Sequence, residues 1–97
     1  MTSYQNITQE QAKTLIKKGA TLADIRDKAS FDSEHIYDAF HLTNENIQDF
    51  IRDNDLDRPL IIYCYHGYSS QNAAHFLHEQ GFEQVYSLIG GYTQWQN

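Results

Sequence analysis

Short apolar runs alternate along the chain with stretches whose apolar residues recur at helical spacing. The most strand-like run is Leu60–Tyr63, which follows the single proline, Pro59, and suits a central parallel strand buried on both faces. Further strands are predicted at residues 4–7, 20–25, 39–42 and 84–88.

The intervals between these strands carry helix signals. The segment Thr8–Gln11 fits a capping box with Thr8 as the N-cap, and Gly19 is placed to end the helix that follows. Thr43 is expected to cap a later helix. Helices are predicted at 8–18, 29–34, 43–54 and 70–80, with a last turn that contains Trp95. Strands that alternate with helices predict an α/β fold with a mostly parallel sheet.

The composition is ordinary for a soluble protein, with 40% hydrophobic and 21% charged residues. A length of 97 residues leaves room for one core, so residues 1–97 are expected to form a single domain. The net charge of −6 argues against nucleic acid as a partner, because that binding rests on Lys and Arg contacts to phosphate. No stretch approaches the ~20 apolar residues that span a membrane, and the polar N-terminus shows no secretory signal.

The only cysteine, Cys64, comes directly after the buried strand. One cysteine cannot form an internal disulfide, so a reducing, cytoplasmic setting is expected. In open α/β sheets ligands bind at the carboxyl ends of the strands, and Cys64 occupies such a position. A cysteine without context is most often an inert core residue, but the loop that follows this one favours chemistry.

A short loop, residues 65–69, joins the strand to the next predicted helix. Its backbone N–H groups lack intrahelical partners and can surround an anion. Gly67 permits the turn, and Ser69 or Ser70 is expected to cap the helix. We expect Cys64 to be a nucleophile with a pKa below the ~8.5 of a free thiol. The residues assigned to substrate binding are Tyr65, His66, Gly67, Tyr68 and Ser69.

Three motifs stand in order along nearly the whole chain. The first is Leu22-Ala23-Asp24-Ile25-Arg26-Asp27, followed by Phe31, His35-Ile36 and Ala39-Phe40-His41-Leu42. The second is Cys64-Tyr65-His66-Gly67-Tyr68-Ser69-Ser70. The third comprises Gly81-Phe82, Val85-Tyr86 and Gly90-Gly91-Tyr92 with Trp95. Together they resemble a rhodanese domain, in particular the single-domain thiosulfate sulfurtransferases of the GlpE type.

This resemblance implies a rhodanese-like fold, with a central, mostly parallel sheet flanked by helices on both faces. It also implies a two-step reaction that needs no metal or organic cofactor. The Cys64 thiolate takes the outer sulfur of thiosulfate, releases sulfite and becomes a persulfide, and a second nucleophile then removes the sulfur. Cyanide, a cellular thiol and thioredoxin are the acceptors that the resemblance suggests.

The end of the loop departs from a common family pattern. Many rhodanese loops carry an arginine where this chain has Ser69, and its absence predicts weak affinity for thiosulfate, because Arg binds such anions bidentately. The GlpE-type branch resembles this arginine-free form. Cysteine phosphatases need an arginine six positions after the cysteine; Ser70 stands there, which argues against phosphoryl transfer.

Other candidate residues are expected to be structural. Arg26 is predicted to form an ion pair, and Trp95 to seal the last helix. Histidines 35 and 41 are expected to be hydrogen-bonded at the sheet rim, and histidines 75 and 78 to lie on a solvated helix face rather than in a metal site. The sequence leaves open whether His66, Tyr65 and Tyr68 contact the substrate.

Two further functions stay open at this point. One is a persulfide carrier, which receives sulfur from a partner enzyme and needs a docking surface more than a thiosulfate pocket. The other is a catalytically idle binding module, against which the intact cysteine and glycine loop argue.

Overall fold

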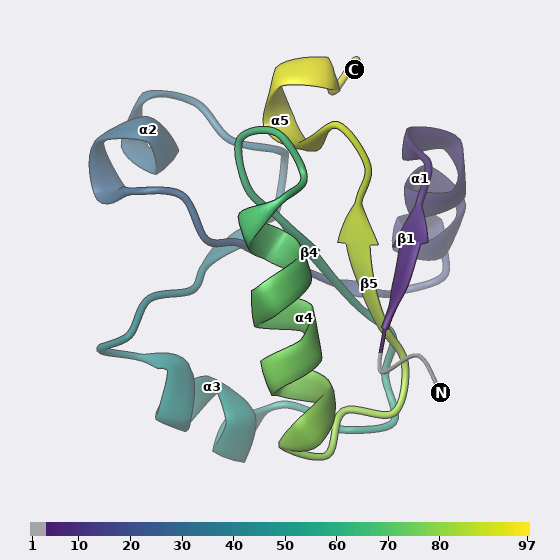
Figure 1. The fold of residues 1–97 in the computed structure, drawn as a ribbon, viewed down its shortest axis with the longest axis vertical. Helices are drawn as coiled ribbons and strands as arrows, with labels where there is room; N and C mark the ends of the chain where they lie inside the picture. The colour runs from purple at the N-terminus through teal and green to yellow at the C-terminus, as the bar shows by residue number, and fades with distance from the viewer. Residues whose placement is uncertain (1–3) are drawn as a thin grey trace.

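A computed structural model describes residues 4–97, in which helices cover a central sheet (Figure 1). Its strands are β1 (Gln5–Ile7), β2 (Thr21–Asp24), β3 (Phe40–His41), β4 (Leu60–Tyr63) and β5 (Val85–Leu88). Its helices are α1 (Gln9–Lys17), α2 (Lys28–Ser33), α3 (Ile47–Asp53), α4 (Ser69–Glu79) and α5 (Gly91–Gln94). None of the helices in residues 4–97 has both the length and the apolar character needed to cross a membrane.

The described strands form one sheet in the order β1-β5-β4-β2-β3, and every neighbouring pair is parallel. β4 is therefore the middle strand, and each of its four residues is buried, as its apolar run predicts. Because the strands are parallel, their carboxyl ends meet at one edge of the sheet. Cys64 directly follows β4 at that edge.

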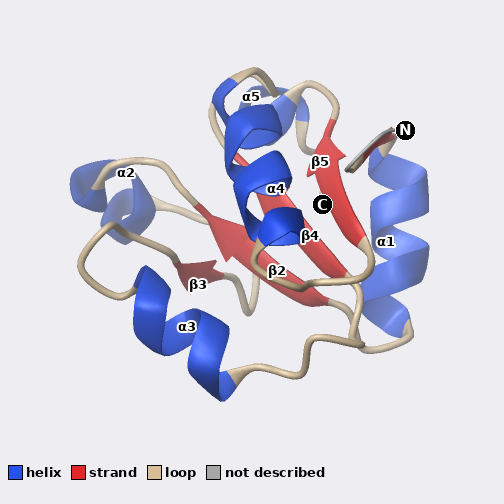
Figure 2. Cartoon of the chain, turned by 60° about the horizontal axis from the view of Figure 1, so that its bottom comes forward, coloured by secondary structure: helices blue, strands red, loops and turns tan. Residues whose placement is uncertain are grey.

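Helices pack on both faces of the sheet, and side chains of β4 point alternately to each. Leu60 and Ile62 join the core beneath α3 and α4, which Figure 2 shows in front of the sheet. Ile61 and Tyr63 join the opposite core, with residues of α1 and the C-terminal segment. The predicted α/β architecture, with a parallel sheet and helices on both faces, is thereby confirmed. Helix α2 buries no residue and lies at the periphery (Figure 1).

Local signals at the first helix are confirmed in detail. The Thr8 hydroxyl accepts a hydrogen bond from the Gln11 amide at 3.2 Å, and the Gln11 side chain accepts one from the Thr8 amide at 2.8 Å. Gly19 follows the C-cap residue with a φ of 99°, a left-handed conformation that favours glycine.

Two predicted caps are wrong. Helix α3 begins at Ile47, and Thr43 instead exchanges hydrogen bonds with Asn46 in a separate turn that precedes the helix. Helix α4 has Tyr68 at its N-cap position without a side-chain cap. The two serines expected to cap it, Ser69 and Ser70, are its first and second residues, and the Ser70 hydroxyl bonds Cys64 instead. Trp95 lies just beyond α5 as its C-cap residue and packs against the core on the α1 face.

Candidate active site

Cys64 lies at the centre of the sheet's carboxyl edge, between the end of β4 and the loop that leads into α4. Its side chain is buried, with 5% of the residue exposed. The loop residues 65–69 are exposed except for Gly67, and Tyr68 is 77% exposed. The thiol therefore sits at the base of a turn whose outer side chains face solvent.

The sulfur of Cys64 is surrounded by hydrogen-bond partners. The amides of Gly67 and Ser70 each donate to Sγ at 3.2 Å, and the Ser70 hydroxyl lies 3.3 Å from it. Ser70 is the second residue of α4, so its amide is one of the N–H groups that a helix leaves without an intrahelical partner. The loop and the start of α4 thus form an anion cradle around the thiol.

Two opposing effects act on the pKa of Cys64. Burial raises it, because a charged sulfur is less well solvated in the interior. Hydrogen bonds from the Ser70 hydroxyl and from the amides of Ser70, Gly67 and His66 lower it by more. The pKa of Cys64 consequently lies below its ordinary value, as the sequence predicts, and the thiolate is the form that the cradle stabilises.

Helix α5 holds the loop from its other side. The amide of Tyr92 donates to the Cys64 carbonyl at 2.9 Å, and that of Thr93 donates to the Tyr65 carbonyl at 3.0 Å. This approach requires glycine at position 91, because a Cβ atom there would lie 2.5 Å from both carbonyl oxygens. Gly67 is similarly confined: its φ is 95°, and a Cβ atom would lie 2.9 Å from the Gly90 nitrogen.

Residues that follow β2 contact both the loop at 65–69 and α5. Arg26 Nη2 lies 2.8 Å from Asp24 Oδ2, and both side chains are buried, which confirms the structural ion pair predicted for Arg26. The Arg26 guanidinium also stacks 4.1 Å from the centre of the Tyr92 ring. The Tyr65 hydroxyl donates to Asp27, and this bond together with those from Ser30 lowers the pKa of Asp27 to about 2.

The histidines mostly take structural roles. His35 bonds the Phe31 carbonyl and His41 the Arg26 carbonyl, each at 2.7 Å, as predicted. His75 is exposed, but His78 is half-buried and bonds the Phe82 carbonyl at 3.1 Å, so the prediction of a solvated position is wrong for His78. Across residues 4–97, no group of three or more His, Cys, Asp or Glu side chains is placed to hold a metal ion.

The remaining loop side chains point to neighbours outside the cradle. His66 Nδ1 lies 3.4 Å from the Thr93 hydroxyl. Tyr65 reaches Asp27 and Ser30 near the start of α2. Ser69 is exposed at the first position of α4. The substrate-contact roles that the sequence left open for His66 and Tyr65 stay predictions.

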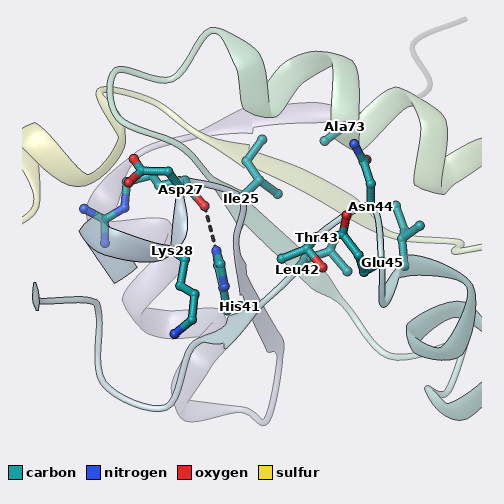
Figure 3. A pocket seen from close by; sticks show the side chains of 11 residues that line it. Ile25, Asp27, Lys28, His41, Leu42, Thr43, Asn44, Glu45 and Ala73 are labelled. Atoms are coloured by element: carbon teal, nitrogen blue, oxygen red, sulfur yellow. Dashed lines mark hydrogen bonds between the residues drawn. The ribbon is translucent and has the colours of Figure 1, made fainter. Parts of the chain in front are cut away.

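Two pockets flank this edge of the sheet. One of about 670 Å³ lies beyond β2 and β3, where Ile25, Leu42 and Ala73 meet the polar Lys28 and His41 (Figure 3). The other, of about 570 Å³, lies between the loop and α5. Its lining includes His66, Gly67, Tyr68, Ile89 and Thr93. Neither lining includes Cys64, so both are neighbours of the cradle rather than the cradle itself.

Sequence reasoning missed two contributors to the cradle. The Ser70 side chain was assigned to helix capping, whereas it bonds the thiol. Ser87 of β5 was not singled out, yet its hydroxyl lies 2.7 Å from that of Ser70. A usable sequence signal for Ser87 is that it is the one small polar residue in the strand Val85–Leu88.

Comparison with known proteins identifies the family. The model of the rhodanese-like domain matches residues 8–97. The chain belongs to the rhodanese-like family. It is 52% identical over 96 residues to the thiosulfate sulfurtransferase GlpE of Pseudomonas syringae pv. syringae, covering 99% of this chain and 91% of that protein. It is 49% identical over 96 residues to the protein of the same name from Shewanella oneidensis, covering 98% and 95%.

Solved structures show the rhodanese-like fold at lower sequence identity. A rhodanese-related protein from Thermoplasma volcanium superposes with a TM-score of 0.79 at 23% identity, covering 95% of this chain and 90% of that one. A rhodanese-like domain protein from Staphylococcus aureus gives a TM-score of 0.81 at 19% identity, covering 96% and 92%. At such identities the likeness supports the fold assignment alone.

Proposed function

We propose that this rhodanese-family chain is a thiosulfate sulfurtransferase in which Cys64 carries the transferred sulfur as a persulfide. The observation that carries the proposal is the Cys64 sulfur itself, which lies 3.2 Å from two donating backbone amides. That cradle occurs in a chain 52% identical to a protein named for this activity. A cysteine held as an anion at the end of a parallel strand is suited to nucleophilic attack.

In the first step the Cys64 thiolate attacks the outer, sulfane sulfur of thiosulfate. A new S–S bond forms to Cys64, and the S–S bond of thiosulfate breaks. Sulfite leaves with that bonding electron pair and so gains the negative charge that the thiolate gives up, while the outer sulfur keeps the negative charge that it already carries in thiosulfate. The chemistry needs no metal or organic cofactor, because the thiolate supplies the electrons and sulfite is a stable leaving group.

In the second step an acceptor nucleophile attacks the outer sulfur of the persulfide. The acceptor–sulfur bond forms while the Cys64 S–S bond breaks, and the Cys64 thiolate is regenerated. Cyanide or a small thiol would serve, as would the thiol of a thioredoxin. Both steps pass through the thiolate, so a cradle that stabilises it assists the attack in one step and the departure in the other.

The loop would bind the substrate as well as the sulfur. We assign substrate contact to Tyr65, His66, Gly67, Tyr68 and Ser69. These residues join Cys64 to α4, and the Gly67 amide among them donates to the Cys64 sulfur. The chain carries a net charge of −6, so local donors must offset the repulsion of a dianion. The N-terminus of α4 supplies positive potential at this point. Ser69, in place of an arginine, predicts a high KM for thiosulfate.

The setting we propose is the cytoplasm, where a single cysteine remains reduced and available. A persulfide carrier fed by a partner protein is the second candidate. It is favoured by exposed apolar side chains near the cradle, Tyr65, Tyr68 and Ile89, which would suit a docking surface. A donor protein would then load Cys64 far faster than thiosulfate does.

Steady-state transfer of sulfur from thiosulfate to cyanide tests the enzyme against the carrier. We expect turnover in the wild type and none in Cys64→Ser, because the hydroxyl cannot form a persulfide. Thr14→Ser, on the exposed face of α1, serves as the matched control and should retain full turnover. Loading of Cys64 without turnover would favour the carrier, and turnover in Cys64→Ser would contradict both.

A further inference from the structure

A pair of buried serines extends the hydrogen bonds of Cys64 into the protein. Ser70 Oγ lies 3.3 Å from the Cys64 sulfur, and Ser87 Oγ lies 2.7 Å from Ser70 Oγ. Both serines are 0% exposed. The chain of atoms Cys64 Sγ, Ser70 Oγ and Ser87 Oγ is therefore closed to solvent beyond the thiol.

Ser87 stands where an apolar residue would be the ordinary choice. It lies two residues after Val85 on β5, so both side chains point to the face of the sheet that α4 covers. A hydroxyl buried there is costly unless it is hydrogen-bonded. The Ser87 hydroxyl bonds the Ser70 hydroxyl, which in turn bonds Cys64, so the burial of Ser87 is compensated by a group of the cradle.

The protons of this pair can be arranged in two ways. Each hydroxyl has one proton to donate. When Cys64 is a thiol, its S–H can donate to Ser70, which can then donate to Ser87. When Cys64 is a thiolate it can only accept, so Ser70 must turn its proton to the sulfur. The Ser70 oxygen is then free to accept from Ser87, and the direction of both bonds is reversed.

We propose that Ser87 is a positioning residue for sulfur transfer, which acts through Ser70 by donating to it whenever Cys64 is a thiolate. That donation holds the Ser70 proton on the sulfur and polarises the Ser70 hydroxyl, so the bond to the anion is strengthened. The inference rests on the proposed role of Cys64 as nucleophile. The donation from Ser87 matters in both steps, since the Cys64 thiolate attacks in the first and leaves in the second. Between the steps the inner sulfur of the persulfide is neutral.

The test is the pH profile of Cys64 alkylation by iodoacetamide, with thiolate absorbance in the ultraviolet as a second readout. Ser87→Ala should raise the pKa of Cys64 by roughly half a unit to one unit, and Ser70→Ala by about one unit. Below these pKa values, one unit corresponds to a roughly tenfold lower rate of alkylation. Ser87→Thr, which keeps a hydroxyl, should restore the wild-type profile.

A double-mutant cycle separates positioning from a merely structural effect. Because Ser87 acts only through Ser70, the double variant Ser70→Ala/Ser87→Ala should show the pKa of Ser70→Ala alone. Val85→Ala, also buried on β5, should lower the stability and leave the pKa of Cys64 unchanged. The titratable groups on the surrounding elements, Asp24, Arg26, Tyr63, His66 and Tyr92, are the same in all these variants.

An unchanged pKa in Ser87→Ala would overturn the proposal, as would shifts that simply add in the double variant. Alkylation requires neither thiosulfate nor an acceptor, so this outcome is independent of turnover. If the wild type failed to transfer sulfur, the proposed function would fall while the alkylation profile still decided the role of Ser87.

Discussion

At the scale of single residues, Cys64 combines burial with ionisation. Burial alone would keep the thiol neutral, as it does for most core cysteines. Here the Ser70 hydroxyl and the amides of Ser70, Gly67 and His66 act on the sulfur, and their combined effect on the pKa exceeds that of burial. Hydrogen bonds to an anion are about twice as strong as those between neutral groups, which is why these few bonds can outweigh burial.

The lowered pKa of Cys64 predicts a pH dependence with a definite sign. In the folded protein the rate of alkylation should rise with pH and level off below the ~8.5 of a free thiol. In urea, where the cradle is lost, the same rise should move to that ordinary value. An identical profile in the two states would contradict the role of the cradle.

The same shift links the ionisation of Cys64 to stability. The folded pKa is lower than the unfolded one, so the thiolate contributes stability that is fully present above the unfolded pKa. That contribution is lost as pH falls through the folded pKa. Cys64→Ser removes it, so the difference in unfolding free energy between wild type and variant should shrink towards low pH.

At the scale of elements, two helix N-termini meet at one loop. Helix α4 directs the Ser70 amide to the sulfur, and α5 directs the amides of Tyr92 and Thr93 to loop carbonyls. The N-terminus of α4 stabilises the charge on the Cys64 sulfur, and the N-terminus of α5 fixes the backbone of Cys64 and Tyr65. A helix of four residues such as α5 is not stable by itself. We therefore attribute the formation of α5 to its hydrogen bonds with the loop.

Gly91→Ala should therefore disrupt the loop rather than α5 alone. A Cβ atom would lie 2.5 Å from the carbonyl oxygens of Cys64 and Tyr65, so the two elements must separate. We expect a loss of several kcal/mol in stability, or at least a hundredfold loss of sulfur transfer. Gly19→Ala is the matched control, because Gly19 also has a positive φ, 99°, but a Cβ atom added there would have no atom within 4 Å. It should lower the stability by about 1 kcal/mol and leave the activity unchanged. Equal effects of the two substitutions would contradict this assignment.

Helix and strand features could be predicted from the sequence where they depend on residues that are neighbours in the chain. The capping box at Thr8, the stop at Gly19 and the buried run Leu60–Tyr63 are all local patterns, and all are confirmed. The caps expected at Thr43 and at Ser69 or Ser70 failed for different reasons. The Thr43 hydroxyl does bond the amide three residues on, but the turn that it closes precedes α3. Ser69 and Ser70 lie inside α4, and the Ser70 hydroxyl has the sulfur of Cys64 as its partner. For Ser70 that partner is brought near only by the fold.

At the scale of the whole molecule, the parallel sheet gathers the site from distant segments. The strand order places β4 between β2 and β5, so the residues after β2 and the start of α5 flank Cys64. The sequence could predict that Cys64 ends a central strand. It could not predict the contact of Ser87 with Ser70, 17 positions apart, because that contact depends on how α4 packs over β5.

The buried pair Asp24–Arg26 should make a large contribution to global stability. Asp24→Ala leaves the Arg26 guanidinium buried without its carboxylate, so we expect a loss of about 3 kcal/mol in urea unfolding. Lys28→Ala breaks the exposed pair with Asp32 and should cost less than about 1 kcal/mol. Comparable losses would argue against the buried pair as a central support.

We further propose that residues 1–97 unfold as a single domain. Fluorescence of Trp95 and far-ultraviolet circular dichroism should then report the same urea transition for the wild type. Separate transitions would contradict a single cooperative unit.

The most direct test of sulfur transfer at Cys64 is the intact mass of the protein after brief exposure to thiosulfate, followed by cyanide. A persulfide mechanism predicts a gain of one sulfur atom, mapped to the peptide that contains Cys64, and its complete loss on addition of cyanide. Cys64→Ser should show no gain. Thiosulfate turnover by a wild-type protein that never acquires this sulfur, or a sulfur adduct that persists in Cys64→Ser, would contradict Cys64 as the carrier.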